Sequence, residues 1–123
     1  MAVRTAVVSY PSIQQGRSAV YAWSGLLNGD TGTTLDPTVF DGAALQVTGT
    51  FGVGGSLTLE GTVDGTNYVA LNTLAAAAIA VTAAGLVQIQ SPGAYLNIRP
   101  RVTAGDGTTN LVATLLLRAT NRY

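Results

Sequence analysis

Apolar and polar residues alternate with a period of two along much of the chain from about residue 43 onward. In residues 45–51 and again in residues 57–63, leucine, valine, phenylalanine and glycine occupy one set of alternate positions, and threonine, glutamine and glutamate occupy the other. Such alternation predicts two half-buried β-strands. Because residues 52–55 between them are glycine-rich, we expect the two strands to form a β-hairpin.

Turn residues divide the rest of the chain into further strands. Asp64-Gly65 supplies the positive φ that a tight hairpin turn requires, and residues 68–71 are expected to return as the next strand. Residues 96–103 alternate again, but Pro100 lacks a backbone donor, so we place that strand at a sheet edge or beside a bulge. After a loop at residues 104–110, residues 111–118 are almost continuously apolar, which predicts a strand buried on both faces.

The alanine-rich residues 74–84 allow two interpretations. Alanine has the highest helix propensity, which favours a short helix. However, Thr82, the Ala-Ala-Gly that follows it and the strand-like residues 86–90 fit a strand, a turn and a second strand equally well. An isolated helix of this length is only marginally stable, so we favour the strand.

The first 42 residues alternate less regularly than the rest, although residues 3–10 and 18–27 are compatible with strands. The length fits one domain, and short strands separated by turns predict an all-β fold. We expect an antiparallel β-sandwich of jelly-roll type over residues 43–123. Residues 1–42 are expected to form a less regular N-terminal arm, with one or two strands, that contacts a partner. A closed barrel stays an alternative, because periodicity does not give strand order.

Charge is scarce in this chain. Charged residues make up 10% of the 123 residues, against roughly 25% in ordinary globular domains, and the formal net charge is zero. Little then keeps copies apart, so we expect the surface to be covered in a homo-oligomer or a larger assembly. A neutral chain has no electrostatic drive toward nucleic acid, so no nucleic-acid partner is expected. The longest weakly polar run, residues 74–87, is shorter than the roughly 20 residues of a membrane span, so no membrane partner is expected either.

Most side chains that carry catalysis are missing. The chain has no His, Cys or Lys, and Glu60 is its only glutamate. Acid–base and nucleophilic catalysis rely mainly on those residue types, whereas arginine binds but does not transfer protons. Asp30, Asp36 and Asp41 are close in sequence, but their spacing matches no calcium loop. We therefore expect no enzymatic activity, no catalytic residue, no metal site and no cofactor.

Aromatic residues near the N-terminus are candidates for binding a partner. Tyr21 and Trp23 are two residues apart and face the same side of a strand. There they either anchor a protein or sugar partner or fill the core of the sandwich. Tyr10 and Arg17 belong to the same N-terminal segment and complete this set of candidate contacts.

Arg99 and Arg101 form a second candidate site. Their spacing of two places both guanidinium groups on one strand face. They either grip a carboxylate of a partner or form modest surface pairs with Glu60 or Asp64.

From about residue 40 to residue 119 the chain resembles the capsid decoration, or cement, proteins of tailed bacteriophages. The resemblance is carried by residues 55–71, which end in Asp-Gly-Thr-Asn-Tyr-Val-Ala-Leu, by Thr-Ala-Ala-Gly at residues 82–85, by the Ile-Arg-Pro strand at residues 95–103 and by residues 105–109. It implies a copy that sits on the outer surface of the capsid, commonly as a homotrimer, and bridges subunits of the major capsid protein. Such a protein is made in the host cytoplasm and ends in the virion.

Two other functions stay open. Strands followed by Asp-Gly-Thr-Asn-Tyr also occur in carbohydrate-binding and receptor-binding sandwiches, which would expose Trp23 and tyrosines on one face. Within the virion class, a head-completion or tail subunit is a further possibility.

Overall fold

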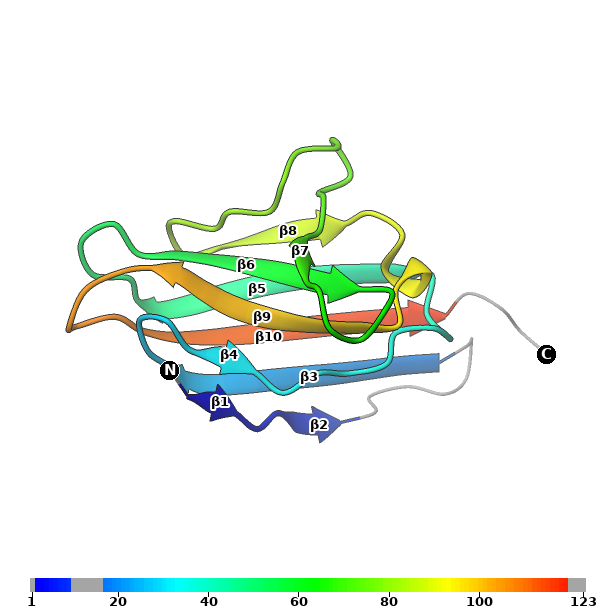
Figure 1. The fold of residues 1–123 in the computed structure, drawn as a ribbon, viewed down its shortest axis with the longest axis horizontal. Helices are drawn as coiled ribbons and strands as arrows, with labels where there is room; N and C mark the ends of the chain where they lie inside the picture. Colours follow the sequence, from blue (N-terminus) through cyan, green and yellow to red (C-terminus); the bar gives the residue numbers. More distant parts are fainter. Residues whose placement is uncertain (1, 10–16, 120–123) are drawn as a thin grey trace.

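The computed structural model describes residues 2–9 and 17–119, which form two β-sheets packed face to face (Figure 1). Sheet A has the strand order β1-β4-β9-β6-β7, and sheet B has the order β2-β3-β10-β5-β8. In sheet A these strands are β1 (Val3–Arg4), β4 (Thr31–Gly32), β9 (Asn97–Ala104), β6 (Ser56–Thr62) and β7 (Val69–Ala70). In sheet B they are β2 (Val7–Ser9), β3 (Arg17–Leu26), β10 (Asn110–Ala119), β5 (Gly42–Thr50) and β8 (Gly85–Ile89), and a 3₁₀ turn, η1 (Pro92–Ala94), precedes β9.

The strands from β3 to β10 pair in a nested order. β3 pairs with β10, β4 with β9, β5 with β8 and β6 with β7, and every one of these pairs is antiparallel. A nested series of pairs folded across two sheets is a jelly roll. The all-β antiparallel sandwich expected from the periodicity is therefore confirmed, and the two separate sheets decide against a closed barrel.

The alternating runs on either side of residues 52–55 are strands, but they do not form the expected hairpin. β5 belongs to sheet B and β6 to sheet A, so the glycine-rich connection crosses from one sheet to the other. By contrast, the Asp64-Gly65 turn joins β6 to β7 as a local hairpin, with Gly65 at a φ of +82°. Alternation identifies a strand, but the pairing partner depends on contacts that are distant in sequence.

The expected edge position of Pro100 is wrong, because β9 lies between β4 and β6 inside sheet A. On the side of β9 that faces residues 30–35, the backbone N–H groups of Ile98 and Val102 donate to carbonyl oxygens. Pro100 alternates with these two donors, so its missing N–H faces the two-residue strand β4, whose ladder with β9 is a single pair. In this segment the carbonyl of Thr33 accepts a hydrogen bond from the indole Nε1 of Trp23 at 3.2 Å.

Residues 74–84 are neither helical nor a regular strand. The segment begins with a turn, in which Ala76 has a φ of +63°, and then runs extended. Val81 makes an isolated bridge with Leu57, and Ile79 and Val81 are buried in the core. The segment is extended rather than helical because the burial of alternate apolar side chains outweighs the helix preference of alanine.

The core between the sheets includes much of the N-terminal third of the chain. β3 lies between β2 and β10 in sheet B, and the side chains of Trp23 and Leu26 are fully buried. The core therefore begins well before residue 43, and a boundary between an arm of residues 1–42 and a core of residues 43–123 does not describe the packing. The alternation in β3 is hard to read because its outward positions, including Val20 and Ala22, are apolar as well.

Asp30 holds residues 2–9 against one side of the sandwich. Its buried carboxylate accepts hydrogen bonds from the N–H of Ala2 at 2.9 Å, from the N–H of Leu27 at 3.0 Å and from Arg4 Nε at 3.0 Å. Burial raises the pKa of Asp30, but donation by Leu27, Ala2 and Arg4 outweighs it and holds the pKa below its ordinary value. Because β1 pairs with β4 and β2 with β3, residues 2–9 close this edge of both sheets.

Candidate interaction surface

The outer face of sheet A carries a cluster of two arginines and one glutamate. Glu60 on β6 lies opposite Arg99 on β9, and its Oε1 accepts a hydrogen bond from Arg99 Nε at 2.7 Å. Its Oε2 lies 3.7 Å from Arg101 Nη1. The ring of Tyr68 stacks against Arg99, with 3.8 Å between the guanidinium carbon and the ring centroid. One carboxylate therefore pairs with two guanidinium groups, and the cluster keeps a formal net charge of +1.

This geometry bears directly on the two interpretations of Arg99 and Arg101. The two side chains share a strand face, as expected, but both turn to Glu60 of the same chain. Arg99 is fixed by a charge-assisted hydrogen bond and by the tyrosine ring. The Arg101 side chain is 49% exposed and held at the longer distance, so it retains donors for a further carboxylate. Binding of a partner by these two arginines stays a prediction.

Tyr21 and Trp23 face the core rather than a partner. Their rings stack with centroids 6.0 Å apart, Trp23 is fully buried, and Tyr21 is partly buried against the same core. An aromatic platform for a sugar would need these rings on the surface, so their positions favour the core interpretation. Tyr10 lies outside the described residues, and the structure describes the backbone of Arg17, at the start of β3, but not its side chain.

The outer face of sheet B differs from that of sheet A because it is almost free of charge. We call it face B. The described outward residues, in register across the five strands, are Val7, Ser9, Ser18, Val20, Ala22, Gly42, Ala44, Gln46, Thr48, Thr50, Leu86, Gln88, Asn110, Val112, Thr114, Leu116 and Arg118. Arg118 is the one charged residue among them. On the central strand β10, Val112, Thr114 and Leu116 are half-buried by their neighbours alone.

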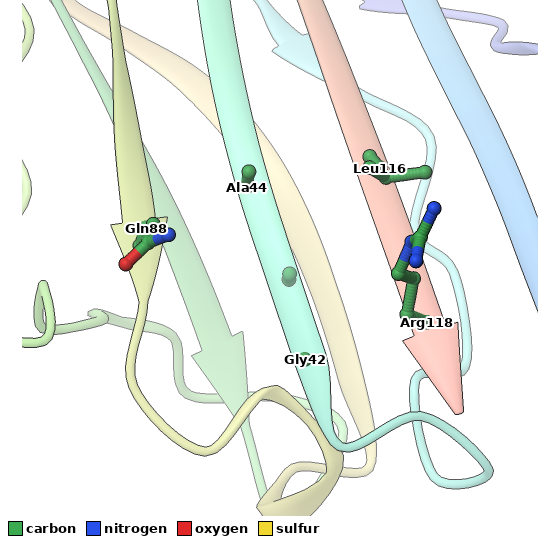
Figure 2. Close-up of a pocket in the computed structure, with 6 residues that line it drawn as sticks. Gly42, Ala44, Gln88, Leu116 and Arg118 are labelled. Atoms are coloured by element: carbon green, nitrogen blue, oxygen red, sulfur yellow. The ribbon is translucent and has the colours of Figure 1, made fainter. Parts of the chain in front are cut away.

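A shallow cavity of about 250 Å³ lies at one end of face B. Figure 2 shows Gly42 and Ala44 on β5 between Gln88 of β8 on one side and Leu116 and Arg118 of β10 on the other. The cavity exists because β5 presents small residues where its two neighbours present long ones. Its walls are apolar, and its polar groups, Gln88 and Arg118, stand at opposite sides, an arrangement that suits an inserted apolar side chain.

A second set of polar contacts ties two loops together at one end of the sandwich. Asp106, in the β9–β10 connection, accepts hydrogen bonds from the hydroxyl of Thr108 at 2.7 Å and from the N–H of Val53 at 2.9 Å. Donation by the Thr108 side chain and by the backbone of Val53 and Thr108 lowers the pKa of Asp106 to about 2. Since Val53 belongs to the β5–β6 connection, Asp106 links two of the connections that cross between the sheets.

The remaining loop carboxylates described have structural partners. Asp64 accepts the backbone N–H groups of Asn67 and Thr66 at 2.8 Å each, and these bonds hold the pKa of Asp64 well below its usual range. Asp36 accepts the N–H of Thr38 at 2.9 Å. Within residues 2–9 and 17–119 no group of three or more His, Cys, Asp or Glu side chains could hold a metal ion. The same residues contain no helix that is long and apolar enough to cross a membrane.

The sequence alone does not identify face B, although the composition of β10 points to it. The nearly continuous apolar run of β10 predicts burial on both sides of that strand. One side packs into the core, through Leu111, Ala113, Leu115 and Leu117, and the other side forms the middle of face B. The sequence does not show that β5 and β8 contribute to face B, because this depends on which strands lie beside β10.

No protein-family model matches the chain, and no curated protein does. Among solved structures, the SPBc2 prophage-derived protein YomS has a similar fold, with a TM-score of 0.64 at 6% sequence identity over 88% of this chain and 100% of that protein. A cupin domain from Bordetella pertussis Tohama I aligns over 96% of this chain and 97% of its own, at 12% identity and a TM-score of 0.47. At these identities the similarity to YomS concerns the fold alone, and the cupin match is too distant to support any argument.

Proposed function

We propose that this chain is a non-enzymatic structural protein of a bacteriophage particle. In this proposal it is a decoration protein that binds the major capsid protein on the outer surface of the head and stabilises the shell by bridging neighbouring subunits. Face B is the surface that makes the contact. The observation that carries the proposal is the nearly uncharged character of this five-stranded face, whose central strand carries apolar side chains that residues 2–9 and 17–119 cover only in part.

The size of face B is sufficient for a specific contact. The five strands of sheet B have a mean length of about seven residues. Because strands lie about 4.8 Å apart and rise about 3.4 Å per residue, face B covers about 600 Å². Covering it with a partner would bury about 1,200 Å² in total, which lies at the lower end of the range for specific protein interfaces. Avidity over several copies would then raise the affinity for a shell.

The cavity on face B supplies a plausible anchor point within that contact. An apolar side chain of the shell protein would insert over Gly42 and Ala44 and contact Leu116. Arg118 at the rim would donate hydrogen bonds to a carbonyl or carboxylate beside the inserted side chain, which fixes the orientation. This contact needs no aromatic residue at the surface.

Three further observations support a virion role. YomS, which has a similar fold, derives from a prophage. The chain lacks His, Cys and Lys, so few residues could perform catalysis. Its low charge fits a surface that is covered in an assembly, and we propose a homo-oligomer, with a trimer favoured by the resemblance to decoration proteins.

Co-sedimentation with empty shells tests this proposal. The shells are assembled from the major capsid protein encoded by the same genome, and the purified chain is added at increasing concentration. We expect saturable binding by the natural chain and by Thr103→Arg, a variant at an exposed position of β9 in sheet A. Gln46→Arg, at an exposed position in the middle of face B, should abolish binding. Failure of the natural chain to bind would contradict the function, and equal binding by both variants would contradict the assignment to face B.

A further inference from the structure

The connection between β7 and β8 carries a run of exposed apolar residues that does not belong to face B. We call residues 74–78 the apolar loop. Leu74 is 59% exposed, and the four alanines that follow it are exposed as well. In Figure 1 the light-green connection between β7 and β8 projects beyond the strands. Such a run of exposed apolar residues is unusual in a soluble domain unless it serves a contact.

The strands on either side of the apolar loop, β7 and β8, also expose apolar side chains. Val69 on β7 is 65% exposed and Leu86 on β8 is 63% exposed. Both strands are the last of their sheets, and between Asp64 and Arg99 the chain contains no charged residue. Edge strands are usually protected from other chains by charged residues or proline, and β7 and β8 carry neither. This edge is therefore suited to being covered.

Hydrogen bonds hold the apolar loop in a defined shape. The N–H of Thr73 donates to the carbonyl of Ala77 at 2.8 Å, and the N–H of Ala76 donates to the carbonyl of Thr73 at 2.9 Å. The N–H of Leu74 donates to the carbonyl of Gln88 on β8 at 3.2 Å. Ala76 adopts a left-handed φ of +63° without being glycine, a conformation that persists only where the surrounding structure imposes it. A loop held in this way loses little conformational entropy when it binds.

The opposite edge of the sandwich shows how this chain covers an edge by itself. There residues 2–9 pair with β4 and β3, and Arg4 forms an ion pair with Asp30 at 3.0 Å. That edge is closed by its own chain and contains charged residues. At the edge of β7 and β8, residues 72–81 make isolated bridges with β6 and β8, but this edge has no such charged pair and its apolar side chains stay exposed.

We propose that the apolar loops of neighbouring copies of this chain contact one another around the symmetry axis of the homo-oligomer. The inference rests on the homo-oligomer of the proposed function and names its contact. Close to a symmetry axis the same residue of every copy comes together, so a charged loop there would repel its copies, whereas an uncharged apolar loop buries surface without that repulsion. The absence of charge between Asp64 and Arg99 permits the apolar loop to lie there.

The absence of cysteine provides a direct test, because a single introduced cysteine reports only its own contact. Leu74→Cys and the control Val53→Cys are purified reduced and then oxidised, and cross-linked pairs are counted on a non-reducing gel. Val53 is 82% exposed, so it is an exposed apolar residue like Leu74, but it lies in a different loop, the β5–β6 connection. We expect Leu74→Cys to cross-link at least ten times faster than Val53→Cys. Equal rates, or no cross-link at position 74, would overturn the inference.

A second pair of variants measures the mass of the assembly by light scattering after gel filtration. Leu74→Arg should fall to the mass of one chain, and Val53→Arg should keep the mass of the natural oligomer. Both positions are exposed, and urea unfolding checks that both variants fold. An unchanged mass for Leu74→Arg would overturn the inference, including the case in which that variant loses shell binding, which would assign the loop to the shell protein. A natural chain that is monomeric yet binds shells would overturn the inference and leave the proposed function standing.

Discussion

The two outer faces of the sandwich differ in how their side chains are satisfied. On sheet A, the outward residues Thr58, Glu60 and Thr62 of β6 are buried by the side chains around them, and the carboxylate among them is bound by two arginines. On face B, Val112 and Leu116 of β10 are apolar and only half-buried, Thr114 lies uncharged between them, and the single described charge, Arg118, stands at one end. The ion-pair cluster of sheet A therefore satisfies its own charged groups, whereas face B leaves apolar surface in contact with water.

This difference indicates that the outer face of sheet A contributes to stability and that face B contributes to binding. A polar cluster whose groups bind one another contributes to the fold, but a partner would have to break those contacts to use them. The apolar side chains of a nearly uncharged face lower the free energy of the system when a complementary surface removes them from water. We therefore expect changes on sheet A to alter the free energy of unfolding, and changes on face B to alter binding.

Glu60→Ala is expected to have the largest effect on stability. It removes the buried carboxylate that Arg99 and Arg101 share, and leaves both guanidinium groups with less than full hydration. We expect the free energy of unfolding, measured by urea titration, to fall by about 2 to 3 kcal/mol. Glu60→Gln keeps an acceptor for Arg99 and should lose less. A loss below about 0.5 kcal/mol for Glu60→Ala would show that the cluster does not stabilise sheet A.

Leu116→Arg tests face B with a charge beside the cavity on its central strand. The side chain lines the cavity and lies outside the core, so the free energy of unfolding should change by no more than about 0.5 kcal/mol. Shell binding should weaken at least about 30-fold, which corresponds to about 2 kcal/mol and the effect of a central interface residue. The affinity is measured by co-sedimentation on the shells described above. An unchanged affinity would remove face B from the contact.

Arg101→Ala tests whether sheet A takes part in binding as well as in stability. The residue is half exposed and 3.7 Å from Glu60, so its loss should lower the free energy of unfolding by at most about 1 kcal/mol. Shell binding should be unchanged if only face B docks. A tenfold loss of affinity without a loss of stability would instead show that Arg101 binds a carboxylate of the partner.

Acid unfolding tests the loop contact of Asp106, which belongs to neither face. Its pKa is lowered from 3.8 to about 2 in the folded chain, so its contribution to stability is present above pH 3.8 and is lost as the pH falls toward 2. Asp106→Asn should therefore flatten the decrease in unfolding free energy between pH 4 and pH 2. The other lowered aspartates, Asp30, Asp36 and Asp64, act in the same direction, so the difference between variant and natural chain is the quantity to compare. Identical curves would show that Asp106 does not couple the two connections.

Local pattern was sufficient to predict most strands but not their partners. The alternation in residues 45–51 and 57–63 identified β5 and β6, and Asp64-Gly65 identified the turn between β6 and β7. The same alternation wrongly joined β5 to β6 in a hairpin, because a glycine-rich connection suits a turn within one sheet and a crossing between two sheets alike. Pro100 was placed at a sheet edge or beside a bulge because its missing donor is visible in the sequence, whereas the short partner strand β4 is not.

The candidate sites divide in the same way. Spacing placed Arg99 with Arg101 and Tyr21 with Trp23 on shared strand faces, since successive residues of a strand point to opposite sides. Whether such a face meets a partner, the core or a glutamate of the neighbouring strand depends on which strand lies beside it. The cavity of face B combines side chains from β5, β8 and β10, which come together only through the nested pairing.

Strand content, scarcity of catalytic side chains and low charge can all be predicted from the amino-acid sequence of this protein. These properties follow from the local preferences and the chemistry of individual side chains. The burial of Trp23, the binding of both arginines by Glu60 and the apolar surface on face B and on the apolar loop become visible only in the folded chain. Pairing in a jelly roll joins residues far apart in the chain, and burial and ion pairing are consequences of that pairing.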